Sequence, residues 1–543
     1  MVFFLIQNGL IKTTPITLQT NPKKPIIYFQ SKTQKFLTPY NFINKLIKPN
    51  SKNHLNSTNE PSKLILSNKK SKKIGDELII EVNSDKNNDE NKRKSKKKMV
   101  YLSGVGYFVQ GFRCFPWLAL NFHMANNLKF DPSTLQLVQY SANLPMVAKP
   151  LYGVLCDAIH IGGSHRIPYI CIGVLLQVLS WGPLAVIPFV GELLPTLMAC
   201  VLLSNLGAAI TEVVQDALVA EYGQKHKIVG LQSYTFMAIA FAGILGNLVG
   251  GVLLSRTHPR VVLFLFSILL LLQLIFTSFT KEDPPARDLV DQGSILSSIK
   301  RRFSELLTAL SGERIRQPLI WAVVSIAMVP MLNGSIFCYQ TQFLKLDPST
   351  IGLSKVIGQV LLLSLTLLYD RFWKTMPFRK LMTRVQMLYA ASLLLDLVLV
   401  TQTNLKIGIP NDVFALCFCG LAETAAVFKT VPFLVLIGSL CPPGCEATVN
   451  AFLASALTLS SIASGFFGIG LASLLGITST NYSNLPVGIV LQCFAALLPL
   501  FWINTLPVAV PSFEKDRSKV GSRRNRKNRR LRSGDIQVIQ NLK

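Results

Sequence analysis

The stretch Lys129-Phe-Asp-Pro-Ser-Thr134 occurs twice in this chain, with a single residue changed. The second copy, Lys345-Leu-Asp-Pro-Ser-Thr350, lies 216 positions further on, and a long apolar run follows each copy. Each run ends at an aspartate that is followed nine positions later by an arginine. A repeat of this length in a hydrophobic chain is typical of membrane transporters built from two homologous halves.

Composition indicates the same class. Of the 543 residues, 50% are hydrophobic and only 15% are charged, and the mean hydropathy is +0.39. These values are unusual for a soluble protein of this length and ordinary for a polytopic membrane protein. The net charge of +27 comes mostly from the tails, because residues 1–98 hold 20 Lys+Arg against 7 Asp+Glu and residues 514–543 hold 11 against 3. We therefore expect the basic C-terminal tail to contact anionic lipid, and no nucleic-acid partner.

The sequence shows no pattern typical of an enzyme or of a metal site. The ten cysteines are scattered, with no Cys-x-x-Cys motif and no pairing with histidine. Serine, histidine and aspartate do not cluster either, which disfavours a membrane-bound enzyme or assembly factor. We expect no catalytic residues, no cofactor and no metal.

The first 98 residues predict a targeting segment. They are rich in Lys, Asn, Ser and Thr, the first acidic residue is Glu60, and no arginine precedes Arg93. An acid-poor, hydroxyl-rich start is typical of an organelle transit peptide, and the lack of arginine favours the plastid over the mitochondrion. The alternative is a disordered cytosolic tail, whose basic end at 92–98 holds the first helix on the positive side of the membrane.

The remaining core divides into about twelve apolar segments, each of the length that a membrane-spanning helix needs. We expect an all-α polytopic membrane protein with two six-helix halves. The domains are a transit peptide and tail at 1–98, a first bundle at 99–279, a central loop at 280–316, a second bundle at 317–506 and a basic tail at 507–543. The approximate spans are 101–124, 133–156, 167–189, 193–220, 228–255, 260–279, 317–343, 350–369, 382–402, 411–436, 446–475 and 485–506.

Basic residues in the connections predict the orientation. The loops on the side of both termini hold 15 Lys+Arg, and the opposite loops hold 5. Because positive loops stay on the cytoplasmic side, both termini are expected in the cytosol or, in a plastid, in the stroma.

A second feature is the run Gly153-Val-Leu-Cys-Asp157, followed by Arg166. An aspartate at the C-terminal end of a helix needs a cation nearby, because the helix dipole disfavours an anion there. Asp370 and Arg379 repeat this spacing in the second half. The motif resembles the Gly-x-Leu-x-Asp loop of the major facilitator superfamily, which latches the two halves on the inner side, and this resemblance implies the major facilitator fold. The residues predicted to serve gating are Gly153, Asp157, Arg166, Asp370 and Arg379.

Ionisable residues inside the apolar segments are the next candidates, because a charge in the membrane is costly unless it is paired or faces water. Glu212 and Asp216 stand four apart, on one helix face. Two carboxylates so placed repel when both are ionised, which favours proton uptake and predicts an ion-coupling site. The alternative is that each neutralises a cation on another helix. The other intramembrane ionisable residues are Arg113, Lys149, Lys355, Asp396, Glu423, Lys429 and Glu446.

Several motifs, in order along the chain, resemble the folate-biopterin transporter family, and most closely its plastid-targeted plant branch. They are Gly106-Tyr-Phe-Val-Gln-Gly111, Asn143-Leu-Pro-Met-Val-Ala-Lys-Pro-Leu-Tyr-Gly153, Asp216-Ala217, Leu231-Gln-Ser233 and Leu440-Cys-Pro-Pro-Gly-Cys-Glu-Ala-Thr448. The resemblance implies twelve helices around a central cavity and a folate or pterin as the small-molecule substrate. The predicted location is a chloroplast membrane, the envelope in particular.

A folate carries two carboxylates on its glutamate tail, so the cavity must supply cations. Under that resemblance we expect Arg113, Lys149 and Lys429 to bind the substrate, with Phe115 and Trp117 stacking on the pterin ring. The alternative is transport of another organic anion on the same fold. The sequence does not indicate an oligomeric state, and a monomer is the default expectation.

Overall fold

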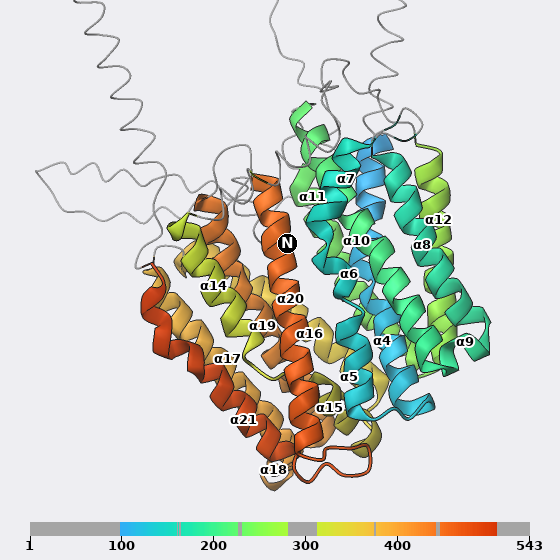
Figure 1. Ribbon diagram of the computed structural model, residues 1–543. Coiled ribbons are helices and arrows are strands. Elements are labelled where there is room, and N and C mark those ends of the chain that lie inside the picture. The colour runs from blue at the N-terminus through green and yellow to red at the C-terminus, as the bar shows by residue number, and fades with distance from the viewer. Residues whose placement is uncertain are drawn as a thin grey trace, which may run out of the picture.

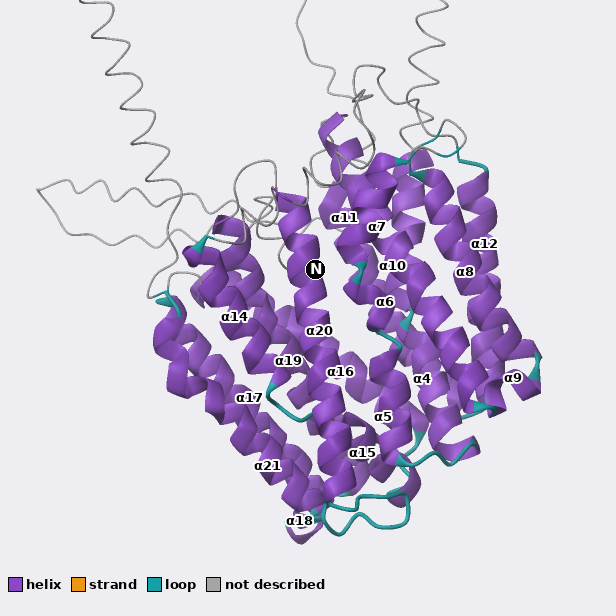
Figure 2. Cartoon of the chain, in the orientation of Figure 1, coloured by secondary structure: helices purple, strands orange, loops and turns teal. Residues whose placement is uncertain are grey.

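The computed structural model describes residues 98–507, apart from 160, 162–163, 165, 226–230, 281–303, 305–311, 374–375 and 441–445. The predicted transit peptide at 1–98 and the basic tail at 507–543 therefore lie almost entirely outside the described residues, as does most of the predicted central loop. The described chain is made of helices and their connections, with no named strand in it (Figure 2).

The first half begins with a helix over 98–112 that continues, after a turn at Arg113, into α4 and the π-helical turn η1. The second span is broken into three short helices, because Pro145 and Pro150 lack the N–H that a continuous helix needs. The elements of this half are α4 (Cys114–Phe122), η1 (His123–Asn127), α5 (Pro132–Ser141), α6 (Leu144–Val147), α7 (Lys149–Ala158), α8 (Ile167–Val186), α9 (Pro188–Glu192), α10 (Leu194–Lys225), α11 (Leu231–Leu254) and α12 (Pro259–Ser278).

The second half repeats this plan. Its first span is interrupted at Pro330, after α14, and ends in another π-helical turn, η3. The elements are α14 (Glu313–Ala327), α15 (Asn333–Cys338), η3 (Tyr339–Phe343), α16 (Pro348–Leu368), η4 (Tyr369–Trp373), α17 (Phe378–Val400), α18 (Thr403–Lys406), α19 (Asn411–Leu440), α20 (Glu446–Leu474), α21 (Leu485–Leu497) and η5 (Leu498–Thr505).

Nine helices in the described part are long and apolar enough to cross a membrane. The other three predicted spans, 101–124, 133–156 and 317–343, are also present, as helices broken into pieces. The predicted all-α polytopic fold with about twelve spans is therefore confirmed. Figure 1 shows the blue-to-green first half beside the yellow-to-red second half. The helix over 98–112 begins at the same end of the bundle at which η5 ends. We call that end the terminal side, and the opposite end, which holds Asp131 and Asp347, the far side.

The repeated phrase forms the same turn twice on the far side. In each half a π-helical turn ends the first span, and the lysine of the phrase then adopts a left-handed backbone, with φ of 51° at Lys129 and 54° at Lys345. Asp131 and Asp347 follow as the N-cap residues of α5 and α16, each with proline at the first helical position. Proline suits that position because its fixed φ is helical and no N–H is needed there.

These two turns join the halves crosswise. Asp131 accepts hydrogen bonds from the backbone N–H and the hydroxyl of Ser479, at 3.2 and 2.8 Å, across to the connection that follows α20. Asp347 accepts one at 3.1 Å from Ser255, which follows α11 in the first half. Each half thus begins a helix of its own at an aspartate whose side chain binds the other half.

Glycines allow helices of the two halves to touch on the far side. On α11, Gly251 faces Gly352 of α16, and a Cβ built on Gly352 would lie 2.8 Å from the Cα of Gly251 and 2.7 Å from the carbonyl oxygen of Asn247. Gly246 faces the opposite way, toward Cys114 on α4. The glycine-rich helix α11 therefore packs closely on both sides, because small residues let helix backbones approach.

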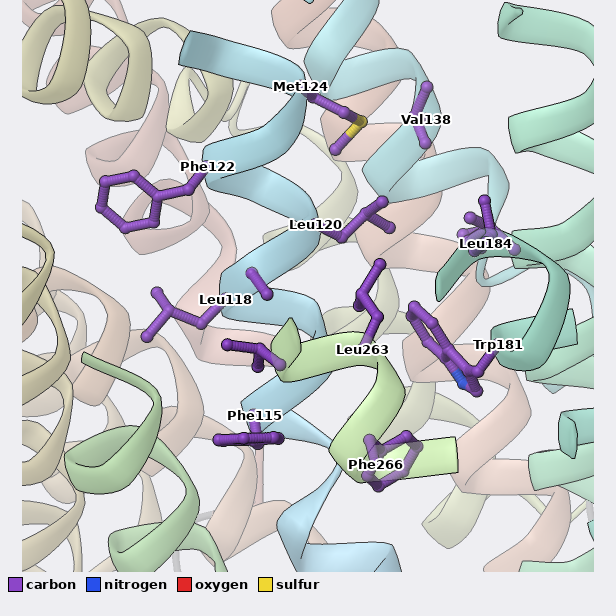
Figure 3. Packing of buried hydrophobic residues seen from close by; sticks show 14 of the residues in the cluster. Phe115, Leu118, Leu120, Phe122, Met124, Val138, Trp181, Leu184, Leu263 and Phe266 are labelled. Carbon is purple, nitrogen blue, oxygen red and sulfur yellow. The ribbon is translucent and has the colours of Figure 1, made fainter. Parts of the chain in front are cut away.

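Within the first half, α4 packs against α8 and α12. Figure 3 shows Phe115, Leu118 and Leu120 along α4, with Trp181 and Phe266 beside them. The rings of Trp181 and Phe266 meet edge to face, with centroids 6.0 Å apart. Since aromatic pairs favour that arrangement, the cluster fixes how these helices cross.

Substituting Gly352 with alanine is expected to destabilise the protein by about 1–3 kcal/mol, because the added Cβ meets backbone atoms that no side-chain rotation can move away. Gly470→Ala is the matched control, since nothing lies within 4 Å of a Cβ at that position on α20. Thermal unfolding of the purified variants in detergent measures the difference. Equal melting temperatures for the two variants would contradict the close contact of α11 with α16.

Candidate functional site

A cavity of about 400 Å³ lies between the two halves. Trp117 of α4 and Tyr140 of α5 line it from the first half. Lys355 of α16, Asp396 of α17 and Glu423 of α19 line it from the second half. Aromatic, hydroxyl and charged side chains thus face a single space, as expected for a site that receives a polar small molecule.

A second cavity, of about 260 Å³, adjoins the first. The two share Tyr140, Asn333 and Glu423 as lining residues. The side-chain amide of Asn333 donates to the hydroxyl of Tyr140 at 3.3 Å, which joins the two halves at the boundary between the cavities. The two spaces are therefore neighbouring parts of a single site.

Lys429 is the cation of the second cavity. Its side chain is only 2% exposed, and its Nζ donates to the carbonyl oxygen of Ser325 at 2.9 Å. The same nitrogen lies over the rings of Trp321 and Tyr389, 5.8 and 5.6 Å from their centroids. Within the described chain, no carboxylate forms an ion pair with Lys429. A buried cation held only by a carbonyl and aromatic faces can take an anion as its partner.

The larger cavity holds a paired set of charges as well. Lys355 and Glu423 form an ion pair at 3.1 Å, from α16 to α19. Asp396, also on the cavity wall, is 5% exposed. The cavity wall therefore carries two acids and one base.

Three of the five predicted substrate-binding residues, Arg113, Phe115 and Lys149, lie apart from both cavities. Arg113 donates to the side-chain oxygen of Asn205, whose amide donates in turn to the carbonyl of Ala142 at 2.6 Å. Phe115 is 2% exposed and packs against Phe112, with ring centroids 4.8 Å apart. Of the predicted aromatic pair, Trp117 lines the larger cavity and Phe115 belongs to the core of the first half.

Lys149 and the predicted proton-coupling acids meet inside the first half. Lys149 of α7 forms an ion pair with Glu212 of α10 at 2.8 Å. Asp216, one turn further along α10, accepts a hydrogen bond from the hydroxyl of the buried Tyr107. The two acids therefore have different partners, a cation for the first and a neutral hydroxyl for the second.

On the terminal side, Arg166 joins three helices of the first half. It is the N-cap residue of α8, is 7% exposed, and approaches Asp157 of α7 to 2.7 Å and Glu221 of α10 to 3.5 Å. Burial disfavours the charged guanidinium, but Asp157 and the sulfur of Cys156, 3.3 Å away, stabilise it and raise the pKa of Arg166 above its ordinary value. Gly153 stands one turn before Asp157 on the same helix, where a Cβ would lie 3.3 Å from Val213.

The corresponding residues of the second half are arranged differently. Arg379 donates to the backbone carbonyls of Asn504 and Leu506, at 2.6 and 2.8 Å, and so ties α17 to the end of the last span. The side chain of Asp370 lies outside the described part of the structure, so the predicted pair of Asp370 with Arg379 stays a prediction.

Comparison with known families decides the class of the protein. The family model described as the BT1 family matches residues 110–524, which is most of the chain. The chain belongs to the BT1 family. The predicted kinship with the folate-biopterin transporters is confirmed, and this BT1 family member is a transporter and not an enzyme.

Similar proteins agree on family and fold. The Arabidopsis thaliana protein named "Probable folate-biopterin transporter 9, chloroplastic" is 56% identical to this BT1 family member over 81% of the chain and 82% of the relative. A Synechocystis protein named "Folate-biopterin transporter" is 28% identical over 76% and 82%. The solved structure of a D-xylose-proton symporter matches with a TM-score of 0.56 at 16% identity, covering 76% of this chain and 98% of the symporter. The fold is therefore the major facilitator fold.

Several residues of the site did not stand out in the sequence of this BT1 family member. Tyr107, Tyr140 and Asn205 are neutral, and only their position beside an acid, a cavity or Arg113 distinguishes them. Asp396 gave a signal, as an acid within an apolar segment, but its place on the cavity wall follows from the packing of α17.

The ion pair of Lys149 with Glu212 predicts that the cost of replacing Lys149 depends on the charge of Glu212. Lys149→Met should destabilise by about 1–3 kcal/mol, because it leaves Glu212 charged and largely buried. The double variant Lys149→Met with Glu212→Gln should recover most of that loss, as read by melting temperature in detergent. Glu192→Gln, which breaks the exposed pair with Arg260, is the control and should change stability by less than about 0.5 kcal/mol. A double variant as unstable as Lys149→Met would rule out mutual compensation.

Proposed function

We propose that this protein transports folates or related pterins across a plastid membrane by alternating access of its two halves. The observation that carries the proposal is the site between the halves, where Lys429 has no acidic partner among the described residues and Trp117 lines the cavity wall. Folates combine a flat ring with a dianionic tail, and that combination suits an aromatic wall beside a buried cation. The names of the Arabidopsis and Synechocystis relatives support the same substrate class.

Substrate contact is proposed first for Lys429 and Trp117, because both line the cavities between the halves. Arg113, Lys149 and Phe115 face other parts of the protein in this conformation, so their predicted contact with substrate stays a prediction.

The location and assembly of the protein are proposed from the same evidence. Chloroplastic relatives and the acid-poor start of the chain support a plastid membrane, and a role in solute exchange favours the envelope. We propose that the protein acts as a monomer, and that its basic C-terminal residues contact anionic lipid.

Uptake into vesicles tests the substrate class. Lipid vesicles containing the purified full chain are expected to take up labelled folic acid and labelled biopterin. Vesicles that contain the Lys429→Gln variant should take up folic acid more slowly. Excess citrate should not compete, because it lacks the ring. Uptake of citrate or another simple organic anion, without uptake of folic acid or biopterin, would replace the proposed substrate by the alternative.

Proton coupling is proposed for the acids of α10. Asp216, held by the hydroxyl of Tyr107, has no cation within ion-pair distance in the described chain, whereas Glu212 has Lys149. Asp216 is therefore the better placed of the two to exchange a proton with solvent during transport. In the same vesicles an imposed proton gradient should drive accumulation of the substrate. The Asp216→Asn variant should no longer accumulate substrate but should still exchange it across the membrane. If accumulation by the unsubstituted protein does not depend on the gradient, both acids are structural partners.

Gating is proposed for Gly153, Asp157 and Arg166, and by analogy for Asp370 and Arg379 in the second half. The 2.7 Å pair between Asp157 and Arg166 ties the short helix α7 to α8 on the terminal side, where the halves must part and close.

Asp157→Ala and Arg166→Ala should each slow transport about tenfold or more with a smaller effect on substrate affinity, because a pair of this kind stabilises a single gating state. Exchanging the two residues, Asp157→Arg with Arg166→Asp, should recover part of the rate. Glu221→Gln is the control, since Glu221 lies further from Arg166 and is 57% exposed. Unchanged rates in both single variants, with the protein folded and inserted, would refute the gating role.

A further inference from the structure

Asp396 is a buried acid that has no partner among the residues the structure describes. It lies on α17, is 5% exposed and lines the larger cavity between the halves. In the part of the chain that the structure describes, neither a hydrogen bond nor an ion pair reaches its carboxylate. A buried carboxylate in a membrane span is costly unless a donor satisfies it, so a donor supplied from the cavity is the simplest account.

The neighbouring charges do not fill that role. Lys355, the cation of the same cavity, is engaged by Glu423 at 3.1 Å. The cavity therefore presents Asp396 as an acceptor in need of donors. Trp117 and Phe337 line the same space, so a flat ring that carries those donors would find aromatic surface beside the acid.

The adjoining cavity has the opposite requirement. Among the described residues no carboxylate forms an ion pair with Lys429, and Glu423, which lines both cavities, is paired with Lys355. Tyr389, whose ring lies 5.6 Å from the Lys429 nitrogen, stands seven residues before Asp396 on α17. Seven residues are two helical turns, or about 10 Å along the axis. The site thus offers an anionic acceptor, Asp396, and a cationic donor, Lys429, on the order of 10 Å apart in two adjoining cavities.

We propose that Asp396 binds the edge of a pterin ring that carries the 2-amino group and the neighbouring ring N–H, and that Lys429 binds a carboxylate of the substrate tail. The two N–H donors of the ring are side by side and parallel, so one carboxylate accepts both, as it does from a guanidinium. This assignment rests on the proposed function and deepens it, since it states which end of the substrate lies in which cavity.

A simple organic anion does not fit this arrangement. Its negative charge would be repelled by Asp396, and it would leave the acid without donors. A substrate that has both a donor edge and an anionic tail satisfies Asp396 and Lys429 together. The pair therefore favours pterins over carboxylates that lack the ring, and folates over pterins that lack the tail.

Binding of three probes to the purified full chain in lipid nanodiscs tests the assignment. Folic acid has both ends, biopterin has the donor edge without carboxylates, and p-aminobenzoylglutamate has the tail without the pterin ring. The variants are Asp396→Asn and Lys429→Gln. Asp412→Asn, an exposed acid at the start of α19, is the matched control.

The expected result is a double dissociation. Asp396→Asn should weaken folic acid and biopterin by about tenfold or more and leave p-aminobenzoylglutamate unchanged, because charge-assisted hydrogen bonds to the ring are lost. Lys429→Gln should weaken folic acid and p-aminobenzoylglutamate by a similar factor and leave biopterin unchanged. Asp412→Asn should bind all three as the unsubstituted protein does.

A ligand change gives the same test without any change to the protein. A biopterin analogue with a carbonyl in place of the 2-amino group should bind the unsubstituted protein about tenfold or more weakly. Equal affinity for this analogue, or an Asp396→Asn variant that binds biopterin normally or loses all three probes alike, would overturn the assignment while leaving the proposed function in place. If the unsubstituted protein binds neither folic acid nor biopterin, the proposed function itself fails and the assignment with it.

Discussion

The side-chain amide of Gln136 makes three hydrogen bonds between the two halves. It donates to the carbonyls of Met331 and Gly465, at 2.7 and 2.8 Å, and its oxygen accepts from the N–H of Gly334 at 3.0 Å. All three partners are backbone groups of the second half. The carbonyl of Met331 and the N–H of Gly334 lie where the first span of that half is interrupted, and the carbonyl of Gly465 lies within α20. In a membrane such groups must be satisfied within the protein, so one glutamine both closes the broken span and fixes the contact between the halves.

The repeated turn gives this contact its symmetry. Asp131 and Asp347 each begin a helix of their own half and each accept a hydrogen bond from a serine of the other half. Beside one of these turns, Gly251 and Gly352 let α11 and α16 touch backbone to backbone. The far side is therefore closed by short side chains and bare backbone, which pack without filling the cavities between the halves.

Charge pairing separates structural groups from functional ones. Lys149 and Lys355 each have an acid within 3.1 Å, so their charges are satisfied inside the protein. Lys429 and Asp396 are both at least as buried and have no such partner among the described residues. Because an uncompensated charge in a membrane protein is costly, the unpaired groups are the ones whose partner is expected to come and go. Those two groups line the cavities between the halves.

The sequence by itself determined the number and order of the spans and their division into halves, because apolar length and a local repeat are written along the chain. It also predicted the spacing that brings Arg166 beside Asp157, since only a short loop separates them. The tertiary structure alone decided that Lys149 meets Glu212, 63 positions away, and that Asp131 meets Ser479, 348 positions away. It alone placed Trp117 on a cavity and Phe115 in the core, two residues apart on one helix. Such contacts depend on how helices cross and rotate against one another, and packing of many side chains sets those angles where no short pattern records them.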